Sequence, residues 1–305
     1  MLVQAWKRMR KLAPEQRMWV VAPANLAADV RRALPRMRKG NLIVEPSPRD
    51  TGPAVGLACA TVAASDPSAI VGIFPTDHVI RRDADFVRAV GVAAAAASRG
   101  SLVCLGIRPD RPATGFGYLK CAGKPVLGRA MAVERFVEKP DAARARRFLA
   151  SGRYLWNAGM FVWRVDRFLD ELGRTAPRIL TAVRGCVAGR TASWNRAPRL
   201  SVDYAVMEKA TNVELVPLDA GWDDVGSWDA ASRLREEASR GSTTINVDSP
   251  GSVAFGDERL IALVDVPDVV VVDTPDALLV VSRSASEKVR HVVEELRKRR
   301  RKDLL

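Results

Sequence analysis

The chain has 305 residues, of which 48% are hydrophobic and 27% charged, and its net charge at pH 7 is +13. These values are typical of a globular chain that folds as one large domain or two of ordinary size. No apolar run approaches the length of a membrane span, and the first eleven residues are basic and amphipathic, so we expect neither a membrane segment nor a secretory signal. Four scattered cysteines without C-x-x-C spacing argue against a zinc site and predict a cytoplasmic location.

The positive charge is carried mainly by arginine and is concentrated in residues 31–39, 144–147 and 297–302. Such charge can attract nucleic acid or an anionic small molecule. No nucleic-acid-binding motif accompanies these stretches, and aromatic residues make up only 6% of the chain. We therefore interpret the arginines as solvated helix faces and predict no nucleic-acid partner.

The first third of the chain alternates helices with short apolar strands. It opens with an amphipathic helix, because apolar residues between Leu2 and Leu12 recur at helical spacing. The alternation that follows predicts parallel pairing in a doubly wound α/β sheet, with a buried strand at residues 70–74. The expected strands are 18–21, 41–44, 70–74 and 102–107, and the expected helices are 27–34, 53–64 and 86–98.

Beyond residue 118 the pattern is more varied and indicates a mixed sheet. After residue 242 it changes to short β segments at near-regular spacing, which predict a small β domain followed by a helix. We therefore expect two domains, residues 1–241 and 242–305. The further expected strands are 135–137, 159–163, 253–255, 260–264, 269–273 and 277–282, and the further expected helices are 166–172, 204–209 and 286–300.

Asp77 and His78 directly follow the expected strand at residues 70–74. Ligands of open α/β sheets bind beyond the carboxyl ends of the strands, so Asp77 stands where a nucleotide or a metal ion would bind. A carboxylate there can hold Mg²⁺, which takes one or two carboxylates together with phosphate oxygens. The alternative is an aspartate that caps the next helix.

Three other stretches place polar or small residues where a ligand could approach. Glu138 and Lys139 precede Pro140, which restricts the backbone and suits a contact to a phosphate or a sugar hydroxyl. Asn157 is a polar residue in an apolar stretch, so its amide needs a partner from the backbone or from a ligand. Gly117 would allow close approach to a ligand, although an ordinary bend explains a glycine there equally well.

The run Gly221-Trp222-Asp223-Asp224-Val225-Gly226-Ser227-Trp228 has two adjacent carboxylates between two tryptophans. Adjacent aspartates repel each other and need water or a cation nearby, whereas the large aromatic side chains favour burial. This combination predicts a carboxylate that faces a site. The alternative is a tight turn with tryptophan anchors and solvated aspartates.

Taken together, seven motifs in this order identify a family: Glu45-Pro-Ser-Pro-Arg-Asp-Thr-Gly-Pro-Ala54, Phe74-Pro-Thr-Asp-His78, Thr114-Gly-Phe-Gly-Tyr118, Phe136-Val-Glu-Lys-Pro140, Trp156-Asn-Ala-Gly-Met160, Ser201-Val-Asp-Tyr-Ala-Val-Met-Glu-Lys209 and Gly221–Trp228. Over most of its length the chain resembles the bacterial mannose-1-phosphate guanylyltransferases, within the sugar-phosphate nucleotidyltransferases. The resemblance implies a GT-A-like α/β catalytic domain with a doubly wound mixed sheet and a small C-terminal β-helix-like domain.

The resemblance also implies roles for individual residues. Asp77 and Asp224 would hold the catalytic Mg²⁺, and Lys139 would contact the 1-phosphate of the sugar. The expected sugar contacts are Glu138, Asn157 and the backbone at Gly117. The expected nucleotide contacts are Thr51, Pro53 and Ala54, which line the guanine pocket, and Asp77. No role is assigned to Asp203, although it lies in a highly specific motif.

The implied reaction is the transfer of GMP from GTP to mannose 1-phosphate, which gives GDP-mannose and pyrophosphate. The implied partners are these two substrates and at most a second copy of the chain, without a membrane. The family's first strand and its triphosphate-binding loop, G-G-x-G-[TS]-R-L-x-P followed by a lysine, do not occur in the 305 residues. Two hypotheses follow: an active enzyme whose true start lies upstream of Met1, or a non-catalytic homologue that binds sugar phosphate. The retained Asp77, Lys139 and Asp224 favour the first, and the missing loop favours the second.

Overall fold

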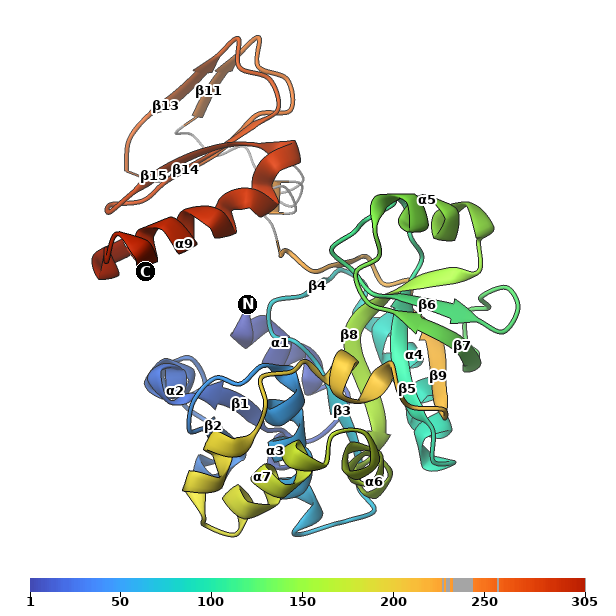
Figure 1. Ribbon diagram of the computed structural model, residues 1–305. Coiled ribbons are helices and arrows are strands. Elements are labelled where there is room, and N and C mark those ends of the chain that lie inside the picture. Colours follow the sequence, from blue (N-terminus) through green and yellow to red (C-terminus); the bar gives the residue numbers. More distant parts are fainter. Residues whose placement is uncertain (227, 229–230, 233–243, 257, 305) are drawn as a thin grey trace. The chain divides into compact units, whose positions relative to one another are not determined.

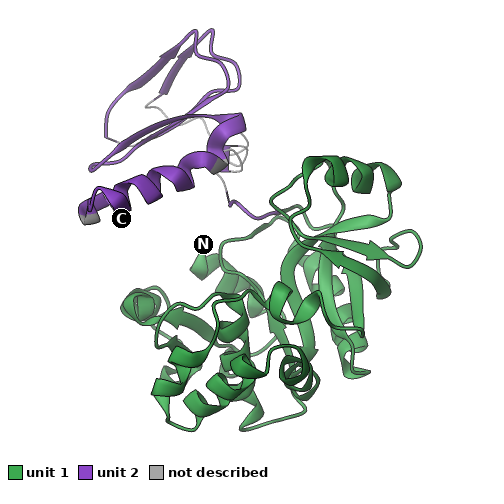
Figure 2. Ribbon diagram, viewed as in Figure 1, with its two compact units in different colours: residues 1–222 green, residues 223–305 purple. Residues whose placement is uncertain are grey.

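The computed structural model describes the whole chain except residues 227, 229–230, 233–243, 257 and 305. The chain forms two compact units, Met1–Trp222 and Asp223–Leu305, which are described separately below (Figure 2). The expected domain boundary at residues 241 and 242 lies outside the described residues and stays a prediction. In the described part of the chain, no helix is both long enough and apolar enough to cross a bilayer.

The first unit is built on a six-stranded sheet with the strand order β3-β8-β5-β9-β7-β6 (Figure 1). The sheet is mixed: β5 is parallel to β9, whereas β8 is antiparallel to both β3 and β5. The expected mixed α/β sheet is thereby confirmed. The strands are β3 (Ile70–Ile73), β5 (Leu102–Ile107), β6 (Tyr118–Cys121), β7 (Met131–Val137), β8 (Tyr154–Arg164) and β9 (Val213–Pro217).

Helices cover both faces of this sheet (Figure 1). Successive side chains of a strand point to opposite faces, so Leu102 and Cys104 of β5 pack with one group of helices and Val103 and Leu105 with the other. Because both faces are covered, the central strand β5 is a continuous apolar run. One face is covered by α3 (Thr51–Ala63), α6 (Val165–Thr175) and α7 (Pro177–Val187), and the other by α4 (Asp83–Ser98).

The strand β3 differs from its prediction, because it is not a buried strand. It lies at the end of the six-stranded sheet, and its residues alternate between exposed and half-buried, with Ile70 43% exposed. A strand at the edge of a sheet pairs with one neighbouring strand instead of two, so it is less buried than a central strand. The apolar composition of residues 70–74 does not specify how many strands pair with this segment.

A separate two-stranded parallel sheet of β1 (Val20–Pro23) and β2 (Leu42–Glu45) lies beside two short helices. Its core contains Val20, Val30 and Leu34, with Leu2 and Trp6 packed against it. These helices are α1 (Leu2–Met9) and α2 (Ala27–Ala33). The remaining elements of the first unit are β4 (Val79–Ile80), α5 (Ala142–Ser151), the π-helix η5 (Asp203–Met207) and the 3-10 helices η1 (Glu15–Arg17), η2 (Ala24–Leu26), η3 (Lys39–Asn41) and η4 (Thr191–Arg196). The unit boundary falls within β10 (Trp222–Asp223).

Among the described residues, the second unit consists of short strands in one two-stranded and one three-stranded sheet. Parallel pairing aligns Thr244 with Ile261 and Val253 with Val270. The hydroxyls of Ser249 and Ser252 accept hydrogen bonds from backbone groups 17 residues further on, at 3.0 and 2.9 Å. This regular offset is what a coiled β-helix-like domain requires and agrees with the expectation. The elements are β11 (Thr244–Val247), β12 (Val253–Phe255), β13 (Ile261–Val264), β14 (Val269–Asp273), β15 (Leu278–Ser282), η6 (Arg283–Lys288), α9 (Val289–Lys298) and η7 (Lys302–Leu304).

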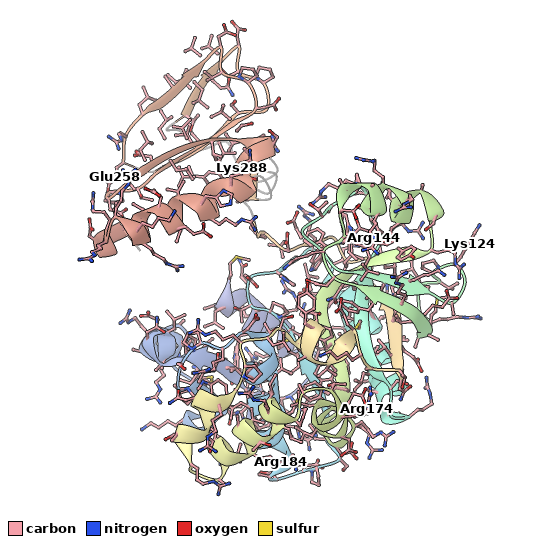
Figure 3. The ribbon with its side chains drawn as sticks, viewed as in Figure 1. Lys124, Arg144, Arg174, Arg184, Glu258 and Lys288 are labelled. Carbon is pink, nitrogen blue, oxygen red and sulfur yellow. The ribbon has the colours of Figure 1, made fainter. Side chains whose placement is uncertain are left out.

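Several basic side chains of the first unit lie on solvated surfaces, as expected (Figure 3). Arg144 on α5, Arg174 on α6 and Arg184 on α7 are all exposed. Arg174 is paired with Glu171 one turn earlier on the same helix. Pairs of this kind stabilise an exposed helix by only a few tenths of a kcal/mol, about 0.3–0.5, so these arginines contribute mainly to the surface charge.

Candidate active site

The structure brings Gly117, Glu138 and Asn157 into one cluster. Gly117 directly precedes β6, Glu138 directly follows β7, and β6 pairs with both β7 and β8. The backbone N–H of Asn157 in β8 donates to the carbonyl of Gly117 at 2.8 Å. A Cβ on Gly117 would lie 2.5 Å from Oε2 of Glu138 and 3.4 Å from Cβ of Asn157. The absence of a side chain at Gly117 therefore allows Glu138 and Asn157 both to lie against it.

Asp203 belongs to the same cluster, although the sequence assigned it no role. Its Oδ1 accepts a hydrogen bond from Nδ2 of Asn157 at 2.7 Å. The other end of that amide, Oδ1, accepts from the backbone N–H of Gly159 at 3.0 Å. Because both Nδ2 and Oδ1 of Asn157 are hydrogen-bonded, the side-chain amide is fixed in a single orientation. Asp203 is the first residue of the π-helix η5, and single π-turns are frequent at functional sites.

Lys139 extends from the rim of this cluster. Its Nζ lies 3.5 Å from Oε1 of Glu138; the lysine side chain is 61% exposed, whereas that of Glu138 is only 9% exposed. Lys139 has a φ of +43°, in the left-handed region that non-glycine residues rarely adopt. The backbone N–H of Glu138 donates to Oε1 of Glu208 at 3.1 Å and ties this strand end to the chain beyond η5.

The two buried carboxyl groups of the cluster both have raised pKa values. Burial is the main cause of the raised pKa of Glu138; the charge of Asp203 adds to it and Lys139 opposes it. Burial also raises the pKa of Asp203, against the hydrogen bond from Asn157. Two acids held close together, with one cation at the rim, suit a ligand that donates hydroxyl hydrogen bonds and carries an anionic group.

The residues expected to contact the nucleotide lie at the first turn of α3. The side chain of Asp50 caps this helix by accepting from the backbone N–H of Thr51 at 2.7 Å. Oγ1 of Thr51 in turn accepts from the N–H of Val202 at 3.0 Å, and the N–H of Gly52 donates to Leu200 at 3.0 Å. These bonds place Thr51, with Pro53 and Ala54 behind it, against the segment that leads into Asp203. The start of a helix is also favourable for anions.

Asp77 lies in the loop after β3 and is exposed. This loop runs beside β8: a Cβ on Gly159 would lie 3.9 Å from both Pro75 and His78. His78 accepts a hydrogen bond at Nδ1 from Nε1 of Trp222 at 3.2 Å. The loop that carries Asp77 therefore borders β8 two residues beyond Asn157.

The two tryptophans of the acidic run act as anchors in different units. Trp222 contacts His78 and Phe116 in the first unit, with ring centroids 5.5 and 5.6 Å apart. Trp228 packs on Phe255 of β12 in the second unit, with centroids 5.5 Å apart. Between them, Val225 has a φ of +48°, which is strained for a β-branched residue. Strained backbone of this kind is typical of functional segments.

The expected metal ligands belong to different units, because Asp77 lies in the first and Asp224 in the second. Their pairing therefore stays a prediction. Within the described residues, no group of three or more His, Cys, Asp or Glu side chains is arranged to hold a metal ion. Mg²⁺ takes only one or two carboxylates when phosphate oxygens and water supply the other ligands, so an exposed carboxylate such as Asp77 fits its requirements.

If the sugar phosphate implied by the resemblance binds at this cluster, Gly117→Ala is expected to raise its KM about tenfold or more, because the added Cβ would displace the carboxylate of Glu138 and small displacements in a binding site are costly. Steady-state kinetics of the full-length protein test this. Gly91→Ala is the matched control, since nothing lies within 4 Å of a Cβ there and α4 tolerates alanine. An unchanged KM in Gly117→Ala would contradict the proposed contact.

The raised pKa of Asp203 predicts how stability depends on pH. An acid whose pKa is raised by folding stabilises the protein below its ordinary pKa, and this contribution is lost as the pH rises through the folded-state pKa. In Asp203→Asn the side chain does not ionise, so the variant does not lose this stability as the pH rises. It also retains an oxygen that can accept the hydrogen bond from Asn157. We therefore expect the Tm of the variant, relative to that of the wild type, to increase as the pH rises above about 4, the ordinary pKa of an aspartate.

Thermal unfolding at several pH values measures this difference. Asp29→Asn is the control, because Asp29 is an exposed residue of α2. A difference in Tm for Asp203→Asn that is constant or decreasing over the same range would show that Asp203 is not held in a protonation-sensitive site.

The fold and the cluster first define a class: an α/β protein with a candidate ligand site at the strand ends of an open sheet. Comparison with known proteins then narrows this class. A family model described as nucleotidyl transferase matches residues 1–240, and one described as MannoseP isomerase/GMP-like beta-helix domain matches residues 242–296. The chain belongs to the nucleotidyl transferase family.

Individual relatives of the chain support the same family assignment. The chain is 42% identical over 270 residues to the Xanthan biosynthesis protein XanB of Xanthomonas campestris, and 36% identical over 292 residues to the mannose-1-phosphate guanylyltransferase of Escherichia coli. These matches cover 84% and 89% of the chain, which spans 57% and 61% of the two relatives. A crystal structure from Thermus thermophilus, described as a mannose-1-phosphate geranyltransferase, matches with a TM-score of 0.84 and 30% identity over 97% of this chain and 89% of that one.

Proposed function

We propose that the protein transfers GMP from GTP to mannose 1-phosphate and thereby forms GDP-mannose and pyrophosphate. The observation that carries this proposal is the cluster of Gly117, Glu138, Asn157 and Asp203 with Lys139 at its rim, next to the first turn of α3. The similarity to a guanylyltransferase over 89% of the chain supports it. Apart from the loop that the 305 residues lack, no observation favours the non-catalytic alternative.

The residues of the cluster would bind and orient the sugar phosphate. Glu138 and Asn157 provide acceptors and donors for sugar hydroxyls, and Gly117 leaves room for the sugar at the strand end. Lys139, which is exposed at the rim, would hold the 1-phosphate by charge. A phosphate oxygen then attacks the α-phosphorus of GTP, the new O–P bond forms, and the bond to the β-phosphate breaks as pyrophosphate leaves. Such catalysis depends on positioning and on neutralisation of charge.

GTP would lie along the first turn of α3, with Thr51, Pro53 and Ala54 near the base. Asp77 and Asp224 would hold Mg²⁺, which when bound neutralises phosphate charge and polarises the α-phosphorus. Asp77 is exposed and the loop that carries it borders β8, so its carboxylate would be able to approach a phosphate group beside the sugar cluster.

The proposal also includes a cellular location, a division into domains and a set of partners. The four cysteines, three of them buried, are all free thiols, which supports a cytoplasmic location. We retain residues 1–241 as the catalytic domain and 242–305 as the β domain, whereas the two compact units divide between Trp222 and Asp223. A homodimer and the absence of nucleic-acid and membrane partners also remain predictions.

The test is the formation of GDP-mannose by the purified full-length protein from GTP and mannose 1-phosphate with Mg²⁺. Pyrophosphate release and chromatography of the nucleotide sugar give two independent measurements. ATP, UTP and glucose 1-phosphate replace the substrates one at a time to define specificity. A protein that binds mannose 1-phosphate but releases no pyrophosphate would contradict the proposal and support the non-catalytic homologue.

A further inference from the structure

Two hydrogen bonds fasten the first turn of α3 to residues 200–202. Oγ1 of Thr51 accepts from the backbone N–H of Val202 at 3.0 Å, and the N–H of Gly52 donates to the carbonyl of Leu200 at 3.0 Å. A Cβ on Gly52 would lie 2.4 Å from that carbonyl oxygen, so a side chain at this position would clash with the segment. The start of α3 and this segment are therefore held at a fixed distance.

The residue that follows this segment, Asp203, is the one that fixes the orientation of Asn157 in the cluster. Its neighbour Val202 is only 2% exposed, and the N–H of Val202 is the group that Thr51 holds. Oδ1 of Asp203 then accepts from Nδ2 of Asn157 at 2.7 Å. Because the backbone is held at Val202, the adjacent Asp203 has little freedom to leave the amide that it contacts.

The far end of the same segment is also tied to the cluster. The N–H of Glu138 donates to Oε1 of Glu208 at 3.1 Å, and the N–H of Glu208 donates to the carbonyl of Asp203 at 2.9 Å. Residues 200–208 thus contact α3, β8 and the residue that follows β7. The proposed nucleotide site at the first turn of α3 and the sugar-phosphate cluster therefore share this one segment.

The polar groups of Thr51 have partners within the chain. Its N–H donates to Oδ1 of Asp50 at 2.7 Å, and its Oγ1 accepts from Val202. The hydroxyl oxygen therefore stabilises the site itself, whether or not a nucleotide is present. Loss of this acceptor would leave the N–H of the buried Val202 unpaired, which is costly, so the segment would have to shift.

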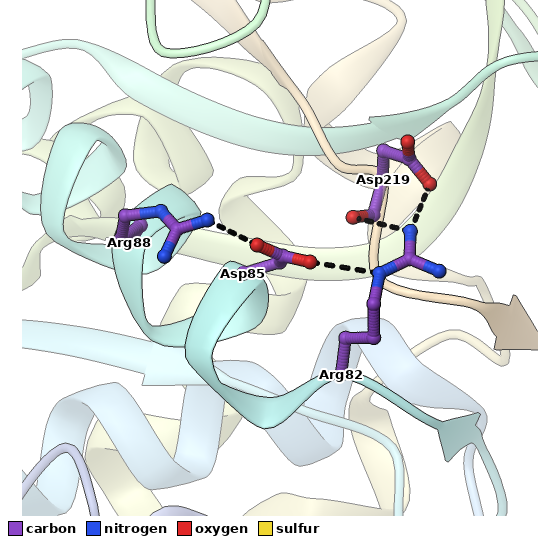
Figure 4. Close-up of polar contacts among 4 residues, drawn as sticks. All are labelled: Arg82, Asp85, Arg88 and Asp219. Carbon is purple, nitrogen blue, oxygen red and sulfur yellow. Dashed lines mark hydrogen bonds and ion pairs between the residues drawn. The ribbon is translucent and has the colours of Figure 1, made fainter.

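The first unit also contains long-range polar contacts that do not involve the cluster. Figure 4 shows that Arg82 contacts Asp85 and Asp219, and that Asp85 pairs with Arg88. This network lies at the start of α4, which covers the opposite face of the sheet from α3. Exposed ion pairs contribute little to stability. The hydrogen bond at the start of α3 differs, because it holds a buried residue beside the cluster.

We propose that Thr51 is a positioning residue for the sugar phosphate. Its Oγ1 holds the N–H of Val202 and thereby keeps the carboxylate of Asp203 on the amide of Asn157. This role rests on the proposed function, because it takes the cluster to be the place where the sugar phosphate binds. It gives Thr51 an effect on the sugar substrate, whereas the resemblance names this residue only as a nucleotide contact.

Isothermal titration of the full-length protein with mannose 1-phosphate and, separately, with GTP and Mg²⁺ tests this role. Thr51→Val keeps the shape of the side chain and removes the acceptor. We expect the weakening of mannose 1-phosphate binding in this variant to exceed any weakening of GTP binding at least fivefold, because small displacements in a binding site are costly. Thr51→Ser, which keeps Oγ1, should recover most of the affinity for mannose 1-phosphate that Thr51→Val loses.

Thr61→Val is the matched control, because Thr61 lies on the same helix and its hydroxyl donates to Leu57 within that helix at 2.8 Å. It should leave both dissociation constants within twofold. Hydrogen–deuterium exchange of peptides that contain Val202 should be faster in Thr51→Val than in Thr61→Val. Weakening of GTP binding by as much as that of mannose 1-phosphate would overturn the positioning role, as would a failure of Thr51→Ser to recover affinity.

The positioning role and the proposed function can fail separately. A wild type that binds both substrates but forms no GDP-mannose would refute the transfer of GMP, and the binding comparison would still decide the role of Thr51. A wild type that forms GDP-mannose, with unchanged affinity for mannose 1-phosphate in Thr51→Val, would refute the positioning role alone. Circular dichroism and thermal unfolding confirm that each variant folds.

Discussion

Asp77→Asn is expected to reduce Mg²⁺-dependent formation of GDP-mannose by about 10³-fold. The side-chain amide keeps the shape of the carboxylate but loses the charge that would hold the metal ion, and metal stabilisation of phosphate charge contributes several kcal/mol to such reactions, with each ~1.4 kcal/mol worth tenfold in rate. Pyrophosphate release by the full-length protein at saturating substrates measures the loss. Asp29→Asn, an exposed aspartate on α2, should retain full activity.

The same assay tests whether Asp77 and Asp224 share one ion. If they do, Asp224→Asn causes a loss of similar size, and the double variant is much less impaired than the product of the two single losses predicts, because groups that act as a unit are not additive. Two losses that multiply would show that the aspartates act separately. Near-normal turnover in Asp224→Asn would remove this residue from the metal site.

Lys139→Met is expected to lower kcat/KM for mannose 1-phosphate by about 10²–10³-fold, in line with the loss of a single donor that stabilises charge during the reaction. Methionine keeps the length of the aliphatic chain and removes the cation. Because Lys139 is 61% exposed, its packing contributes little to stability, so the Tm should not change. Initial rates at varied sugar phosphate and fixed GTP measure the effect.

Lys124→Met is the matched control for this variant, since Lys124 is an exposed lysine outside the cluster (Figure 3). Binding of GTP alone should be the same in both variants and in the wild type. A loss of less than threefold in Lys139→Met would show that the lysine does not contact the phosphate. A fall in GTP affinity of the same size as the fall in kcat/KM would place Lys139 on the nucleotide instead.

Elements with a continuous apolar pattern could be predicted from the sequence. The bounds of β5, β12 and β14 agree with the expected strands at 102–107, 253–255 and 269–273. In contrast, β9 (Val213–Pro217) was not predicted, because Glu214 interrupts its apolar run. The structure explains this residue: its carboxylate accepts from the hydroxyl of Ser101 at 2.8 Å. A charged residue is accommodated inside a strand through a tertiary contact, which local sequence does not reveal.

The candidate site shows the same limit. The motifs singled out Gly117, Glu138 and Asn157, but their contact depends on which strands pair, and that is a property of the whole sheet. Asp203 had no assigned role because its partner, Asn157, lies 46 residues away in the sequence. The predicted burial of β3 failed for a related reason, since its place at the end of the sheet depends on strand order. Sequence patterns identify the chemical groups, and long-range pairing decides which of them meet.

The left-handed backbone of Lys139 has an evolutionary consequence. At a φ of +43° the backbone favours glycine or asparagine, and another residue costs about 1–2 kcal/mol in this conformation. Lysine persists at such a position only while selection maintains its charge. Once that selection ends, random substitution should drift toward glycine or asparagine, since these replacements also relieve the strain. The residue at this position therefore serves as a marker that separates relatives still under selection for phosphate binding from those that have lost it.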